Sequence, residues 1–154
     1  MGDSHPDTLC CLNNLANVFS ARGDYMKAFA LKEECFRQRD ATLGCSHPDT
    51  LTSLYNLAAL HSNTGNDAEA MRLKEECLKL RREYLGNFHR DTLKSLDNLV
   101  TIYIEKSDFA KALPLCEEVL QLRKSTAGLT HIDTLKALNK LAYLYREGGQ
   151  YEKS

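Results

Sequence analysis

Apolar residues near the start of the chain are spaced as on one face of an α-helix. Five of them recur at the i, i+3, i+4, i+7 spacing of one helical face, and Gly23-Asp24 then interrupts the pattern. These five are Leu9, Leu12, Leu15, Ala16 and Phe19. The spacing predicts a helix of about 16 residues that ends before Gly23. A second amphipathic helix is predicted from Tyr25 to around Thr42 and Gly44, because glycine commonly follows the last helical residue.

The same succession of helix, turn and helix returns at a fixed period of 42 residues. The motif His-x-Asp-Thr-Leu begins at His5, His47, His89 and His131, with no insertion or deletion between copies. A constant period in this range is typical of a stacked array, in which each repeat buries its apolar face against its neighbours. The sequence therefore predicts an all-α fold and a single repeat domain over residues 1–154. Its copies are 5–46, 47–88, 89–130 and the partial 131–154.

The repeated motif is interpreted as a helix start. Proline at the first helical position has no amide proton to leave unbonded, aspartate in the first turn favours the positive end of the helix dipole, and the histidine is the expected cap. Ser107 replaces the turn glycine of the other copies, which predicts strain if its φ is positive. Pro114 is expected to bend its helix. Gly148-Gly149 is expected to end the first helix of the fourth copy, and the chain is expected to be a piece of a longer array.

Charged residues are balanced along the chain and argue against two classes of function. The sequence has 20 basic and 21 acidic side chains, and no copy departs from neutrality by more than one charge. Nucleic-acid binding, including RNA binding by a helical-repeat protein, is disfavoured because it needs a basic surface. No apolar run reaches the roughly 18 residues of a membrane span, and residues 1–4 lack the features of a signal peptide. We therefore expect a cytoplasmic protein with neither a nucleic-acid nor a membrane partner.

Cysteine and histidine lack the spacing of a metal site. There is no Cys-x-x-Cys pair, and the four motif histidines are a whole repeat apart. Cys35 and Cys77 are equivalent to Val119 of the third copy, which predicts a small buried packing site, whereas Cys10 and Cys11 are expected to be exposed and prone to oxidation. No phosphate-binding glycine loop or nucleophile elbow is present. We expect no metal, no cofactor and no enzymatic activity.

These repeats resemble tetratricopeptide repeats, and more narrowly the 42-residue repeats of kinesin light chains. The resemblance covers nearly the whole chain and runs from His-Pro through Asn-Leu-Ala, a glycine turn and Ala-x-x-Leu to Leu-Gly. The central triplets are Asn14-Leu15-Ala16, Asn56-Leu57-Ala58, Asn98-Leu99-Val100 and Lys140-Leu141-Ala142. The heptad-rich segment through which kinesin light chains join their heavy chains is missing. The resemblance implies a right-handed superhelical α-solenoid of antiparallel helix pairs, whose concave wall of first helices binds an extended peptide or a partner helix.

Polar residues of the first helices are the predicted peptide-binding residues, because they lie off the apolar stripe and vary between copies. Asn14, Asn56 and Asn98 are the strongest candidates, since a carboxamide can donate to a peptide carbonyl and accept from a peptide amide. An asparagine at this point often does so in peptide-binding tetratricopeptide domains. The alternative is that each asparagine bonds a neighbouring helix and holds the stack. The same wall is predicted to include Asn17, Tyr55, Lys94, Asp97, Thr101, Lys136, Asn139, Lys140 and Tyr143.

Positive charge gathers toward the C-terminal end of this wall. Lys94, Lys136 and Lys140, with Arg146 as a candidate fourth member, predict a ligand with an acidic segment over copies three and four, and solvated lysines are the alternative. The second helices are predicted to present a solvated charged face that includes Lys32, Arg37, Lys74, Lys79 and Arg123. The leading hypothesis is a non-enzymatic protein-interaction scaffold. The alternative is a structural module that is a monomer or self-associates weakly through exposed repeat ends.

Overall fold

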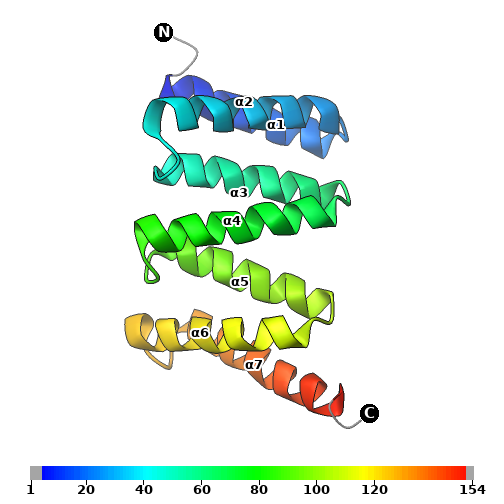
Figure 1. Ribbon diagram of the computed structural model, residues 1–154, viewed down its shortest axis with the longest axis vertical. Helices are drawn as coiled ribbons and strands as arrows, with labels where there is room; N and C mark the ends of the chain where they lie inside the picture. The colour runs from blue at the N-terminus through cyan, green and yellow to red at the C-terminus, as the bar shows by residue number, and fades with distance from the viewer. Residues whose placement is uncertain (1–4, 152–154) are drawn as a thin grey trace. The chain divides into compact units, whose positions relative to one another are not determined.

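A computed structural model describes the backbone of residues 5–151 and the side chains as far as Gly148. Within these residues the chain forms seven α-helices and no strand (Figure 1). The helices are α1 (Pro6–Ala21), α2 (Tyr25–Leu43), α3 (Pro48–Asn63), α4 (Asp67–Leu85), α5 (Arg90–Glu105), α6 (Phe109–Ala127) and α7 (Ile132–Tyr151). Helices of 16 and 19 residues alternate through the first three copies, so the all-α repeat fold is confirmed.

The chain divides into two compact units, Met1–Tyr84 and Leu85–Ser154. In the first unit α1 packs on α2 and α2 on α3, and in the second unit α5 packs on α6 and α6 on α7. Helices α2 and α6 therefore each contact the first helix of their own copy and that of the next copy, which is the nearest-neighbour packing of a repeat array. The single domain expected over residues 1–154 therefore stays a prediction.

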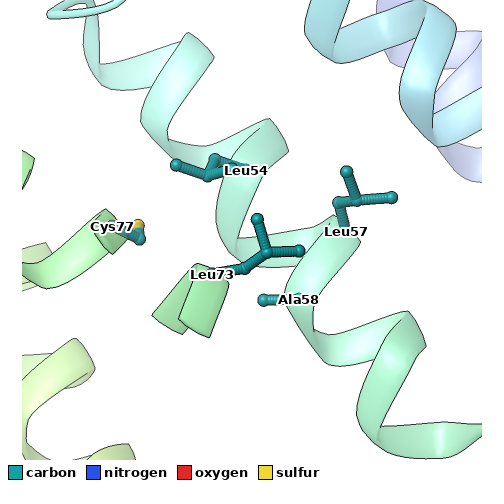
Figure 2. Close-up of a cluster of buried hydrophobic side chains, with 5 residues drawn as sticks. All are labelled: Leu54, Leu57, Ala58, Leu73 and Cys77. Carbon is teal, nitrogen blue, oxygen red and sulfur yellow. The ribbon is translucent and has the colours of Figure 1, made fainter. Parts of the chain in front are cut away.

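A buried apolar cluster joins α3 to α4 in the first unit (Figure 2). Leu54, Leu57 and Ala58 of α3 pack against Leu73 and Cys77 of α4. Four partly buried side chains surround this cluster: Phe29, Phe36, Tyr55 and Leu80. Tyr55 and Asn56, between Leu54 and Leu57, are partly exposed at the edge of this core, whereas Ser53, between Leu51 and Leu54, is buried.

The motif histidines cap the first helix of every copy. In His5, His47, His89 and His131, Nδ1 accepts a hydrogen bond from the backbone amide of the aspartate two residues later, at 3.1–3.3 Å. Each bond satisfies one of the amide donors that a helix start leaves unpaired. The expectation that the motif marks helix starts is thus confirmed.

Ser107 adopts the left-handed backbone conformation that glycine adopts in the corresponding turns. Its φ is 57°, against 79° at Gly23 and 76° at Gly65. Serine is strained there because its Cβ approaches the following carbonyl oxygen, and glycine has no Cβ. The strain predicted for this turn follows from the observed angle.

We expect Ser107→Gly to raise the free energy of unfolding by about 0.5–1 kcal/mol, as relief of left-handed strain outweighs the extra entropy of an unfolded glycine. Gly65→Ser is the reciprocal control and should lower the same quantity by about 1 kcal/mol. A Cβ added at Gly65 meets no atom within 4 Å, so only backbone strain changes. Urea denaturation followed by circular dichroism measures both effects. Equal stabilities of the three proteins would contradict the strain.

The predicted turn at Gly148-Gly149 is wrong. Helix α7 continues over both glycines to Tyr151. In the first three copies a complete second helix packs back on the first, and that packing stabilises the turn. Glycine adopts helical as well as left-handed backbone angles, and here the helical hydrogen bonds continue through the pair. Pro114 lies inside α6 as expected.

Three of the six cysteines are buried. Cys35, Cys77 and Cys116 are buried, whereas Cys10, Cys11 and Cys45 are exposed. The thiols of Cys35 and Cys77 each donate to a backbone carbonyl of the preceding helix, those of Leu9 and Leu51, at 3.4 Å. Val119 is buried at the equivalent position, which confirms the packing site inferred from the repeats.

Iodoacetamide at about pH 8 is expected to modify Cys10, Cys11 and Cys45 of the folded protein and to leave the other three unmodified. Burial excludes the reagent, and it also raises the pKa of the Cys116 thiol to about 11, which keeps that thiol protonated. Mass spectrometry of tryptic peptides gives the modified fraction at each site. Labelling in concentrated urea, where all six should react, is the control, and rapid native labelling of Cys116 would contradict the burial.

Candidate functional site

Amide side chains of α1 and α3 meet the ammonium group of a second-helix lysine in the first unit. Lys32 of α2 donates to Oδ1 of Asn17 at 2.8 Å and to Oδ1 of Asn13 at 3.4 Å. Asn56 of α3 donates through Nδ2 to the same Asn13 oxygen at 3.4 Å. Three helices of this unit are therefore joined by one polar network on the first-helix face.

The second unit has a charged counterpart of this network. Asp97 and Thr101 of α5 are equivalent to Asn13 and Asn17, and Lys140 of α7 is equivalent to Asn56. Lys140 donates to Asp97 Oδ1 at 3.3 Å and to Thr101 Oγ1 at 2.9 Å. Arg123 of α6 also bonds the Asp97 carboxylate, and it donates to the backbone carbonyl of Asp133 at 2.7 Å.

Five predicted peptide-binding residues thus contact neighbouring helices. They are Asn17, Asn56, Asp97, Thr101 and Lys140. For Asn56 the geometry favours the alternative given above, in which the asparagine holds the stack. Asn98 differs, because its Oδ1 is buried and has no hydrogen-bond partner among the described residues. A buried acceptor of this kind is uncommon and calls for a partner.

The remaining predicted residues are not brought into one cluster. Asn14 and Asn139 are exposed, and Tyr55 lies under the guanidinium of Arg81 at 5.0 Å. Lys136 pairs with Asp133 at 3.6 Å, and Tyr143 stacks with Arg146 at 5.5 Å. Lys94 is exposed. Most cations of the predicted acid-binding end therefore already have a partner within this unit.

The solvated charged face predicted for the second helices is wrong for three of its members. Lys32 and Lys74 are each only 6 % exposed, and Arg123 is half-buried against Asp97. Small residues such as Ala28 bring α2 close to α1, so the apolar stem of Lys32 is covered and its ammonium reaches the amides beyond. Burial lowers the pKa of Lys32. Arg37 is exposed as predicted.

Two hollows open on the surface of the first unit. The larger, about 550 Å³, is lined by Asn17, Ser20, Ala21, Tyr25 and Asn63. The other, about 400 Å³, is lined by Met26, Phe29, Ala30, Glu33, His61, Thr64 and Asn66. Sequence reasoning missed Tyr25 and Asn63 in the larger hollow. The repeat period could not have found Asn63, because its equivalent in the first copy is Ala21, which has no polar side chain.

The part of the chain that the structure describes holds neither a metal-ligand cluster nor a membrane-spanning helix. Its histidine, cysteine, aspartate and glutamate side chains form no group of three or more that could hold a metal ion. No helix in residues 5–151 is both long and apolar enough to span a membrane.

Comparison with known proteins agrees with the repeats. The tetratricopeptide repeat family model matches residues 7–83 and 91–154. A crystal structure from Podosopora anserina, assigned as a kinesin light chain with nearly identical TPR-like repeats, is 27% identical over 97% of this chain and 71% of that one, with a TM-score of 0.77. A variant of that protein gives 27% identity over 99% and 72%, with a TM-score of 0.79.

A further similar structure supports the fold alone. BtubC (BKLC) from P. vanneervenii is 19% identical over 97% of this chain and 60% of that one, with a TM-score of 0.77. No curated protein matches the chain. These findings confirm the resemblance to kinesin-light-chain-like repeats that the sequence motifs indicated.

Proposed function

Because the chain belongs to the tetratricopeptide repeat family, we propose that it is a non-catalytic scaffold that binds a peptide segment or helix of another protein against its first helices. Proteins with this fold generally mediate protein–protein interaction or assembly. The larger hollow of the first unit carries the proposal, because it is open, is lined by both polar and apolar atoms, and is formed by α1, the start of α2 and the end of α3.

Exposed carboxamides supply the chemistry for backbone recognition in this hollow. Asn17 and Asn63 lie on its wall, and Ser20 and the ring of Tyr25 add a hydroxyl and an apolar surface. Such a set can bond the amides and carbonyls of an extended peptide and pack against one of its side chains. The near-neutral charge of every copy favours a protein ligand over a nucleic acid. Six free cysteines support a reducing compartment such as the cytoplasm.

The test begins with short peptides selected on the folded chain from a random display library. Affinities for the wild type and for an Asn17→Ala/Asn63→Ala variant are then measured by fluorescence polarisation. Two lost hydrogen bonds of about 1 kcal/mol each should weaken binding about 30-fold. Gln121→Ala, an exposed change on α6, is the matched control. Unchanged affinity of the double variant, with normal helicity, would contradict the proposal.

A second candidate function is self-association through α7. Leu135 and Ala142 are exposed, although the equivalent Leu9 and Ala16 of α1 are buried under α2. An uncovered apolar stripe of this kind is an association surface. Sedimentation velocity at several concentrations tests it, with Leu135→Ser expected to reduce association. A wild type that sediments as a monomer at every concentration would argue for the scaffold function alone.

A further inference from the structure

The smaller hollow of the first unit is separate from the one on which the proposed function rests. One face of α2 forms one side of it, because the four α2 residues that line it follow the i, i+3, i+4, i+7 spacing of a helix face. The end of α3 and the turn after it form the other side. None of the described lining residues belongs to α1 or to the larger hollow. The four α2 residues are Met26, Phe29, Ala30 and Glu33.

Two aromatic rings lie in this hollow. The ring centroids of Phe29 and His61 are 4.7 Å apart, and the ring planes are tilted by 51°. Phe29 also packs against the buried cluster of α3 and α4, so its ring is held in place. The side chain of Met26 is 82 % exposed beside it. A thioether and an aromatic face pack well against a flat or apolar side chain, and the aromatic face also attracts a cation.

Glu33 is an acidic residue without a partner at the edge of this hollow. It is exposed, and among the described residues no side chain donates a hydrogen bond to its carboxylate and no cation lies within ion-pair distance of it. Arg37, the cation one turn further along α2, bonds Glu34 instead. The hollow therefore carries a negative charge that no described residue offsets.

The second unit shows how a partner within the chain satisfies such a carboxylate. Glu117 of α6 is equivalent to Glu33, and Tyr145 of α7 is equivalent to His61. The Tyr145 hydroxyl donates a hydrogen bond to Glu117. In the first unit the imidazole lies beside Asn66 instead, with Nδ2 of Asn66 3.4 Å from Nδ1 of His61. The carboxylate of Glu33 is thus left for a donor from outside the chain.

We propose that the smaller hollow binds an arginine side chain of a partner protein. The Glu33 carboxylate accepts from the guanidinium, whose plane and apolar stem pack on Phe29 and Met26. Arginine suits this site better than lysine, because a guanidinium is planar, stacks on aromatic rings and donates two parallel bonds to a carboxylate. The volume of about 400 Å³ is in the range of small-ligand sites. The inference goes beyond the proposed function, because it assigns a second contact to α2, away from the first helices.

The experiment uses the full chain labelled with ¹³C at the methionine methyl groups and follows the Met26 signal by NMR. Met26→Leu assigns this signal, and Met71, which does not line the hollow, is the internal reference. The probes are acetyl-Ala-Arg-Ala-amide and the same peptide with lysine or with uncharged citrulline in place of arginine. We expect the arginine probe to shift the Met26 signal saturably. Its affinity should be about fivefold higher than that of the citrulline probe and about twofold higher than that of the lysine probe.

Two variants separate the charge of the hollow from its shape. Glu33→Gln removes only the charge and should weaken binding of the arginine probe about fivefold. Ala30→Phe fills the hollow and should abolish the saturable shift. Asp40→Asn, which removes a carboxylate of the same helix outside the hollow, should leave binding unchanged. All three residues are exposed, so we expect the helicity of the wild type in each variant.

Equal affinities for the arginine and citrulline probes would overturn the inference, as would unchanged binding by folded Glu33→Gln. Tighter binding of the lysine probe than of the arginine probe would overturn the assignment to a guanidinium. An absence of shifts with all three probes would also overturn the inference. The proposed function is decided separately, by the affinity of the display-selected peptides for the Asn17→Ala/Asn63→Ala variant, whose two changes lie outside this hollow.

Discussion

Replacing Asp97 with alanine is expected to lower the free energy of unfolding of the second unit by about 2–3 kcal/mol. The Asp97 carboxylate bonds both Arg123 and Lys140, and the three side chains are only 26 %, 12 % and 31 % exposed, respectively. Its removal leaves Lys140 without its carboxylate partner and leaves Arg123 only the Asp133 carboxylate, at 3.8 Å. This loss of unfolding free energy is smaller than the loss expected for a fully buried ion pair, because water still reaches Asp97.

Urea denaturation measures this loss, and two controls separate its causes. Asp97→Asn keeps an acceptor for the two cations and should cost less than alanine. Adding Lys140→Met to Asp97→Ala should recover part of the stability, since the cation left without its carboxylate is then gone. Asp108→Ala removes a partly exposed carboxylate of the same unit that caps α6 and pairs with Lys111, and we expect a smaller effect. A loss at Asp97 no larger than that at Asp108 would contradict the network.

Helix boundaries were readable from the sequence because they depend on neighbouring residues. The His-x-Asp-Thr-Leu motif places a cap and an acidic first turn next to each other, and the structure shows the cap bond in all four copies. Because the period is 42 residues, each helix start and turn motif recurs 42 residues later in the next copy. The exception at Gly148-Gly149 arose because glycine is compatible with a helix as well as with a turn.

The polar network could not be read in the same way. Lys32 and Lys140 occupy different positions of the repeat, yet both reach residues at the places of Asn13 and Asn17. The two lysines are not at equivalent positions of the repeat, so the sequence does not relate them. Only the hydrogen bonds between helices show that both bind the residues at these two places. The structure also shows that Asn56, proposed to read a peptide, bonds Asn13 across 43 residues of sequence.

Replacing Leu73 with alanine is expected to lower the free energy of unfolding of the first unit by about 2–4 kcal/mol. Leu73 of α4 is 6 % exposed and packs against Leu54, Leu57 and Ala58 of α3 (Figure 2). Truncation removes buried methyl groups and leaves a cavity that the rigid helix pair fills only in part. Leu43→Ala, at a residue 44% exposed, is the matched control and should change stability by less than about 0.5 kcal/mol.

Hydrogen exchange tests whether this loss is local. In a repeat array each helix pair is stabilised mainly by its neighbours, so amides of α3 and α4 should exchange much faster in Leu73→Ala, whereas those of α6 and α7 should change little. Uniform acceleration throughout the chain would instead show that both units unfold as one cooperative body. That outcome would also bear on binding, because a ligand held by the first unit would then stabilise the second unit as strongly as its own.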